Sequence, residues 1–264
     1  FKTLFLYYIL ELIMKKIISL FIILFASTSS IAADGKLINY QINNQSYEGY
    51  YISPSKQAPL VLLIHDWDGL TEYEIKRSNM LADLGYAVFA LDLFGAGVRP
   101  TQVKDKRQHT GELYKDRQKM RALMEGALIE AQKQGANTDN AVVTGYCFGG
   151  AAVLEWARSG VNLKGFATFH GGLQKPEGQD YSNVKGQILI LHGTADSAIP
   201  MEQFAKLAKE SGIKKFIYIS SFAAYLCEDK NKNRLCDCYG ESKLSGENGL
   251  KTLSDDLFSV LIIR

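Results

Sequence analysis

Residues 143–152 read VTGYCFGGAA, and this stretch decides how the rest of the chain is interpreted. A single cysteine, Cys147, follows an apolar run and has a glycine two residues away on each side, Gly145 and Gly149. This spacing matches the Gly-x-nucleophile-x-Gly turn between a strand and a helix, with Cys in place of Ser. Side chains at the two glycine positions would clash in so sharp a turn. The pattern predicts a nucleophilic cysteine; the alternative is a buried structural cysteine between packing glycines.

Strand-like and helix-like segments alternate around this turn, from residue 36 to about residue 220. The predicted strands are 36–42, 46–53, 60–64, 86–91, 141–144, 164–169, 187–191 and 215–220, and the predicted helices are 71–84, 111–134, 149–158 and 201–210. Such repeated units predict an α/β fold with a mostly parallel central sheet and helices on both faces. Thr71 is the expected N-cap of its helix, and Gly85 is expected to end it.

Polar residues follow several of these strands. They are His65, Asp66, Cys147, His170, His192 and Asp196. Because ligands of such sheets bind beyond the carboxyl ends of the strands, we expect a crevice at this edge. The N-terminus of the helix after Cys147 would favour a thiolate, and the backbone N–H of Phe148 could hold an oxyanion there.

An acid suited to a catalytic triad stands in LHGTADSAIP (191–200), where Asp196 lies on the loop after a late strand. It is a candidate for orienting a histidine. The alternative is a turn or cap aspartate before Pro200.

Four stretches in order, LLIHDWDGLTEYEIKRSNMLADLGYAVFALDLFG (62–95), VTGYCFGGAA, ATFHGGL (167–173) and ILILHGTADSAIP (188–200), resemble the dienelactone hydrolase family of α/β-hydrolases over roughly residues 36–220. The resemblance implies a Cys-His-Asp triad with Cys147 as nucleophile and Asp196 as acid. It implies an oxyanion hole from the backbone N–H groups of Trp67 and Phe148. It also implies hydrolysis of small esters or lactones through a thioester, with no cofactor and no metal.

Two further positions follow from the same resemblance. In the family, a glutamate beside the first oxyanion residue contacts the resting cysteine; here Asp66 stands there, one methylene shorter. The family's type member holds a substrate carboxylate with arginines. Arg99 lies in the corresponding region, where it could equally be a solvated loop residue.

The histidine of the triad is missing from its usual place. The family carries it after the last strand, but the four histidines here are His65, His109, His170 and His192, and none follows Asp196. Three interpretations remain: His170 or His192 is the base, the protein is an inactive ligand-binding relative, or the tail is translated out of frame. Possible codons for residues 224–227 allow His-Ile-Phe one base along, and we favour this last hypothesis.

The chain ends suggest export. Residues 1–13 are interpreted as an upstream extension and 14–33 as a signal peptide, with Lys15 and Lys16 before a short apolar run and alanines at its end. A membrane anchor would need about 20 apolar residues. A mature domain over 34–220, periplasmic or secreted and free of the membrane, would then precede an atypical tail, 221–264. With 30 basic and 28 acidic residues, the chain offers no electrostatic case for a nucleic-acid partner.

The tail matches known metal sites poorly. A calcium loop would need Gly and Glu where Arg234 and Gly240 stand, and a zinc site lacks a fourth ligand beside Cys227, Cys236 and Cys238. A solvated tail is the simpler expectation, with a closing helix or an unmatched apolar end over 250–264. The charged segment 104–121 is either a cap over the crevice or, as we prefer, the solvated face of a helix.

Overall fold

The computed structural model describes residues 34–193, 196, 198–210, 215–219 and 259–263. The predicted extension, signal peptide and most of the tail, with its three cysteines and the proposed change of frame, lie outside these residues. In the described part, no helix is both long enough and apolar enough to cross a membrane.

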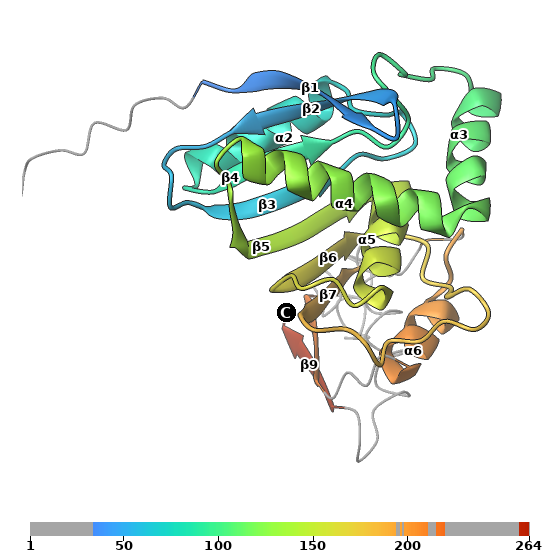
Figure 1. The fold of residues 1–264 in the computed structure, drawn as a ribbon. Coiled ribbons are helices and arrows are strands. Elements are labelled where there is room, and N and C mark those ends of the chain that lie inside the picture. Colours follow the sequence, from blue (N-terminus) through green and yellow to red (C-terminus); the bar gives the residue numbers. More distant parts are fainter. Residues whose placement is uncertain (1–33, 194–195, 197, 211–214, 220–258, 264) are drawn as a thin grey trace, which may run out of the picture. The chain divides into compact units, whose positions relative to one another are not determined.

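Seven strands form the central sheet, in the order β1-β2-β4-β3-β5-β6-β7 (Figure 1). They are β1 (Lys36–Ile42), β2 (Gln45–Ile52), β3 (Pro59–Ile64), β4 (Ala87–Leu91), β5 (Asn137–Tyr146), β6 (Gly165–Phe169) and β7 (Gln187–Leu191). The hairpin β1–β2 and the pair β2–β4 are antiparallel, and all other pairs are parallel. The predicted mostly parallel sheet is confirmed. Its β3 and β4 are apolar runs almost completely excluded from solvent, as strands covered on both faces should be.

The helices are α2 (Glu72–Asp83), α3 (Val103–Lys115), α4 (Arg117–Lys133), α5 (Phe148–Arg158) and α6 (Met201–Glu210). In Figure 1, α4 and α5 lie in front of the sheet and α2 lies behind it, so both faces are covered. The predicted cap of α2 is confirmed. The Thr71 hydroxyl accepts from the N–H of Tyr73, and the Glu74 carboxylate accepts from the N–H of Thr71 (2.8 Å).

The prediction of one helix over 111–134 is wrong. Two helices, α3 and α4, meet at Asp116, whose backbone (φ −110°, ψ 80°) is not helical. The Asp116 side chain accepts from the N–H of Lys119 (2.9 Å) and so caps α4. This local bond competes with continuation of α3, which is why the chain turns here.

The end of the described chain also differs from expectation. The predicted strand 215–220 forms as β8 (Lys215–Ile219), but it pairs in parallel with β9 (Ser259–Ile263) in a separate two-stranded sheet. A closing helix is therefore wrong for 259–263, where apolar β-branched residues favour a strand.

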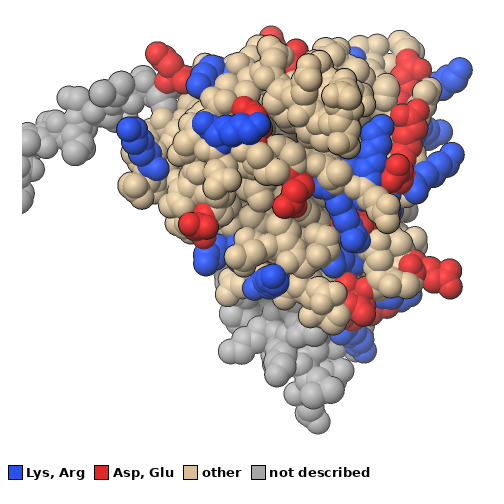
Figure 2. All heavy atoms as spheres, in the orientation of Figure 1, with Lys and Arg blue, Asp and Glu red and all other residues tan. Residues whose placement is uncertain are grey.

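Basic and acidic side chains are interspersed on the face drawn in Figure 2. This face presents charges of both signs to a partner rather than a field of one sign.

Candidate active site

Cys147 stands at a strained turn between β5 and α5. Its φ of 52° and ψ of −112° lie in a region that residues with a side chain rarely adopt. The N–H of Cys147 donates to the carbonyl oxygen of Phe169 (2.9 Å), and its own carbonyl accepts from the N–H of Ala151 (3.2 Å). Cys147 is therefore the single residue between the end of β5 and the beginning of α5.

The flanking glycines are required for space. A Cβ on Gly145 would lie 2.5 Å from the carbonyl group of Gly149. A Cβ on Gly149 would lie 2.5 Å from the carbonyl oxygens of both Ile64 and His65. The steric argument made from the sequence is confirmed, and α5 begins directly against the end of β3.

The thiol of Cys147 is free, and its pKa is raised. Burial is the main cause, and the negative charges of Asp66, Asp196 and Asp68 act in the same direction. The N–H of Phe148 lowers the pKa, as expected for a helix N-terminus, but it is outweighed. Burial and these carboxylates together therefore outweigh the effect of the helix N-terminus on the pKa of the resting thiol, and burial contributes most.

Asp196 contacts a histidine, although not one that follows it in the chain. One of its carboxylate oxygens bonds Nδ1 of His170, and the other accepts from the N–H groups of Ala198 (3.0 Å) and Ile199 (3.1 Å). Burial tends to raise the pKa of Asp196, but the Ile199 N–H and His170 hold it below its usual value. Asp196 therefore both caps its own turn and contacts a histidine.

The other histidines near the strand ends form hydrogen bonds with the backbone. His192 bonds the carbonyl oxygen of Ile199 through Nε2 (2.6 Å), and its side chain is only 2% exposed. His65 is fully buried, with Nδ1 at the carbonyl oxygen of Asp66 (2.6 Å) and Nε2 accepting from the N–H of Leu93 (3.0 Å). These contacts make His65 a packing and bonding residue of the sheet edge.

The loop after β3 brings the predicted oxyanion residue Trp67 to the same edge. One oxygen of Asp66 accepts from the N–H of Asp68 (2.8 Å), which shapes the loop, and the Trp67 ring lies under the ammonium of Lys106 (5.2 Å). Arg99 has a partner of its own, because its guanidinium bonds Glu48 (2.7 Å).

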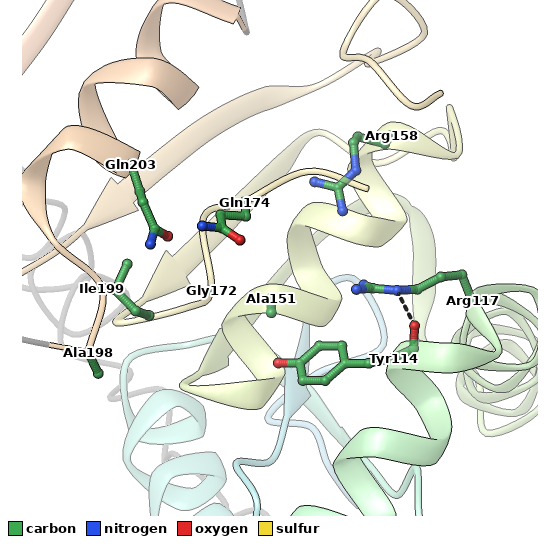
Figure 3. Close-up of a pocket in the computed structure, with 9 residues that line it drawn as sticks. All are labelled: Tyr114, Arg117, Ala151, Arg158, Gly172, Gln174, Ala198, Ile199 and Gln203. Carbon is green, nitrogen blue, oxygen red and sulfur yellow. Dashed lines mark hydrogen bonds between the residues drawn. The ribbon is translucent and has the colours of Figure 1, made fainter. Parts of the chain in front are cut away.

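A cavity of about 430 Å³ adjoins this edge (Figure 3). It is lined by Tyr114, Arg117, Ala151, Arg158, Gly172, Gln174, Ala198, Ile199 and Gln203. Ala151 lies on the first turn of α5 after Cys147, and Ile199 belongs to the loop of Asp196. The cavity is therefore lined by residues from the helix that follows Cys147 and from the loop that carries Asp196, although neither of these two residues lines it.

Tyr114 connects the cavity to the thiol. Its ring packs edge-on against Phe148 (5.5 Å), and burial, together with the nearby Cys147, raises its pKa to about 12. Its hydroxyl is therefore neutral at physiological pH. Figure 3 shows it reaching toward α5 from the end of α3. Most charged side chains of the segment 104–121 are exposed, as we prefer, while Tyr114 and Arg117 from the same segment line the cavity.

The family model for dienelactone hydrolases matches residues 47–226, which include this entire site. The chain belongs to the dienelactone hydrolase family. This membership, together with the fold, makes it an α/β-hydrolase of the ester and lactone class.

Individual proteins that are similar to this dienelactone hydrolase family member support the assignment to the family. The carboxymethylenebutenolidase of Pseudomonas putida is 27% identical over 172 residues, which cover 60% of this chain and 72% of that protein. The solved structure named m3DLH is 26% identical, with a TM-score of 0.66 over 86% of this chain and all of that one. The dienelactone hydrolase-like promiscuous phosphotriesterase P91, from metagenomic libraries, shares the fold at 22% identity and a TM-score of 0.59, over 88% of this chain and 82% of that one.

Proposed function

We propose that this chain hydrolyses small carboxylic esters or lactones with Cys147 as the nucleophile. The observation that carries the proposal is the backbone of Cys147, which has a positive φ at the start of α5 between two glycines that have no room for a Cβ. Strained conformations of this kind cluster at active sites, where they hold a reacting group in place. Here the turn holds the sulfur at the carboxyl edge of the parallel sheet.

The neighbouring groups suit the remaining roles. The N–H of Phe148 lowers the pKa of the Cys147 thiol, and with the N–H of Trp67 it would donate to the oxygen of a tetrahedral intermediate. Asp196 is a charged acid in contact with an imidazole. The adjoining cavity would receive the substrate.

A second candidate is a non-catalytic ligand-binding protein on the same scaffold. The raised pKa of the Cys147 thiol favours it, because a protonated thiol is a poor nucleophile. The sequence favours it too, since no histidine follows Asp196.

The two candidates differ in a direct assay. The unmodified chain and Cys147→Ala would be compared for release of p-nitrophenol from p-nitrophenyl acetate and for alkylation by iodoacetamide, located by peptide mass spectrometry. The hydrolase requires turnover that Cys147→Ala abolishes, and alkylation at Cys147. A chain that is folded by circular dichroism but shows neither turnover nor alkylation is the binding protein.

We also propose that the protein is exported to the periplasm or beyond. The support is the signal-like stretch 14–33. Expression in a Gram-negative host followed by fractionation and N-terminal sequencing tests it. Export requires a mature protein that begins near Asp34, and recovery of the uncleaved chain in the cytoplasm contradicts it.

A further inference from the structure

Among the described residues, four that are not glycine have a positive φ: Asn43, Asn44, Cys147 and His170. The two asparagines form the turn between β1 and β2, where such backbones are ordinary for Asn. The other two are a cysteine and a histidine, for which this conformation costs about 1–3 kcal/mol each. The strain therefore falls on one nucleophilic and one basic side chain.

Cys147 and His170 are neighbours across the sheet edge. β5 and β6 pair in parallel, with Tyr146 opposite Phe169 at their ends. Cys147 directly follows β5 and His170 directly follows β6. The N–H of Cys147 bonds the carbonyl oxygen of Phe169 (2.9 Å), which directly precedes His170. Two strained residues thus leave adjacent strands side by side.

Asp196 links them from a third strand end. Its carboxylate bonds Nδ1 of His170, and its negative charge contributes to the raised pKa of the Cys147 thiol. With Nδ1 directed at the carboxylate, Nε2 is the free nitrogen of the ring, and no bond to it is formed within the described residues. The His170 side chain is 55% exposed, so Nε2 is accessible.

Of the four histidines, His170 is the one that is hydrogen-bonded to the Asp196 carboxylate. All four histidines of the chain lie in its described part. His65 has both ring nitrogens bonded, His192 is buried against the carbonyl of Ile199, and His109 stacks on Phe94 (5.2 Å).

We infer that His170 is the general base of this chain, in a triad with the order Cys147, His170, Asp196. The inference rests on the proposed function. Nε2 of His170 takes the proton from the thiol as the sulfur attacks the ester carbonyl and forms a C–S bond. The C–O bond then breaks, and His170 gives the proton to the departing oxygen. Water attacks the thioester and loses a proton to His170; the C–S bond breaks, the acid leaves, and the proton returns to sulfur.

The test uses two replacements that suit the positive φ. His170→Gly relieves the backbone and leaves a gap beside Asp196, and His170→Asn keeps a side chain that tolerates this conformation. Both should lower kcat/KM for p-nitrophenyl acetate by about 10²- to 10⁴-fold, the usual contribution of a general base. Added imidazole should restore part of the rate in His170→Gly, and a purely structural role could not produce this rescue. His109→Gln is the matched control and should keep the activity.

Different results would contradict the inference about His170 and the proposed function. If Cys147→Ala is inactive but both His170 variants keep the rate within twofold, Cys147 is the nucleophile and the inference about His170 is wrong. If imidazole fails to raise the rate of a folded His170→Gly, His170 acts by position alone and the inference is again wrong. If the unmodified chain neither hydrolyses the ester nor reacts with iodoacetamide at Cys147, the proposed function itself fails.

Discussion

Gly149 packs directly against the carbonyl oxygen of Ile64, so the helix that begins at the nucleophile candidate touches the backbone of β3 with no side chain between them. This contact places the loop after β3, with Asp66 and Trp67, beside the turn of Cys147. The geometry of the site therefore depends on the absence of a single methyl group.

Gly149→Ala should destabilise the fold by about 1–3 kcal/mol, since a Cβ 2.5 Å from two backbone oxygens forces α5 away from β3. Urea unfolding measures the loss. Gly111→Ala is the matched control. Gly111 lies within α3 with nothing within 4 Å of the new methyl, so this change should stabilise by about 0.5–1 kcal/mol. Equal effects of the two replacements would contradict the close approach.

Asp66→Asn should speed alkylation of Cys147 several-fold near neutral pH. The Asp66 carboxylate is one of three charges that raise the pKa of the thiol, alongside Asp68 and Asp196, and the neighbouring Tyr114 is uncharged in this range. Removal of one charge lowers that pKa and enlarges the thiolate fraction. The rate of iodoacetamide labelling against pH measures it.

The control for charge alone is Asp83→Asn. Asp83 is exposed and ends α2, at the edge of the sheet opposite the site, and its loss should leave the labelling rate unchanged. A rate for Asp66→Asn no higher than for Asp83→Asn would show that Asp66 does not influence the thiol.

The parts of the structure that follow from local rules could be predicted from the sequence. The cap of α2 needs only Thr71 and Glu74, three residues apart, and the turn at Cys147 needs only its flanking glycines. The break between α3 and α4 was missed because the bond of Asp116 to its own helix competes with helix propensity, and propensity alone does not settle that competition.

The site itself depends on contacts between distant segments. His170 and Asp196 are 26 residues apart, and their bond requires the two loops after β6 and β7 to meet. The position of Tyr114 against Phe148 likewise depends on how α3 crosses the start of α5. Periodicity places such residues at an edge, but only the fold decides which of them touch.

His192→Phe should loosen the loop that carries Asp196. The ring of His192 stacks near Phe204 (6.2 Å), and Phe preserves this packing but removes the bond to the carbonyl oxygen of Ile199. A buried acceptor left without its donor costs about 1–3 kcal/mol, measured by urea unfolding. His192→Gln, which can return a donor at the position of Nε2, should recover much of the loss. Equal stability of the Phe variant and the unmodified chain would contradict this role.

Glu155 is a buried carboxylate surrounded by guanidinium groups. Its side chain is fully excluded from solvent and bonds Arg121 (2.6 Å), Arg158 (2.9 Å) and Arg117 (3.3 Å). Burial tends to raise the pKa of Glu155, but Arg158 and Arg121 hold it below its usual value. Since two of these arginines also line the cavity, the carboxylate fixes part of the cavity wall.

Glu155→Gln should therefore destabilise the protein by about 3–5 kcal/mol near neutral pH, because three cations lose their shared buried partner. The folded-state pKa of Glu155 is lowered, so its contribution is present above the unfolded-state pKa of about 4.3 and is lost as the pH falls through the folded-state value. Urea unfolding of Glu155→Gln and of the unmodified protein at several pH values should show that the difference between their free energies of unfolding decreases in acid. Glu112→Gln, at an exposed position of α3, should change stability by no more than about 0.5 kcal/mol. If the difference in free energy of unfolding stays constant with pH, the charge of Glu155 does not stabilise the fold.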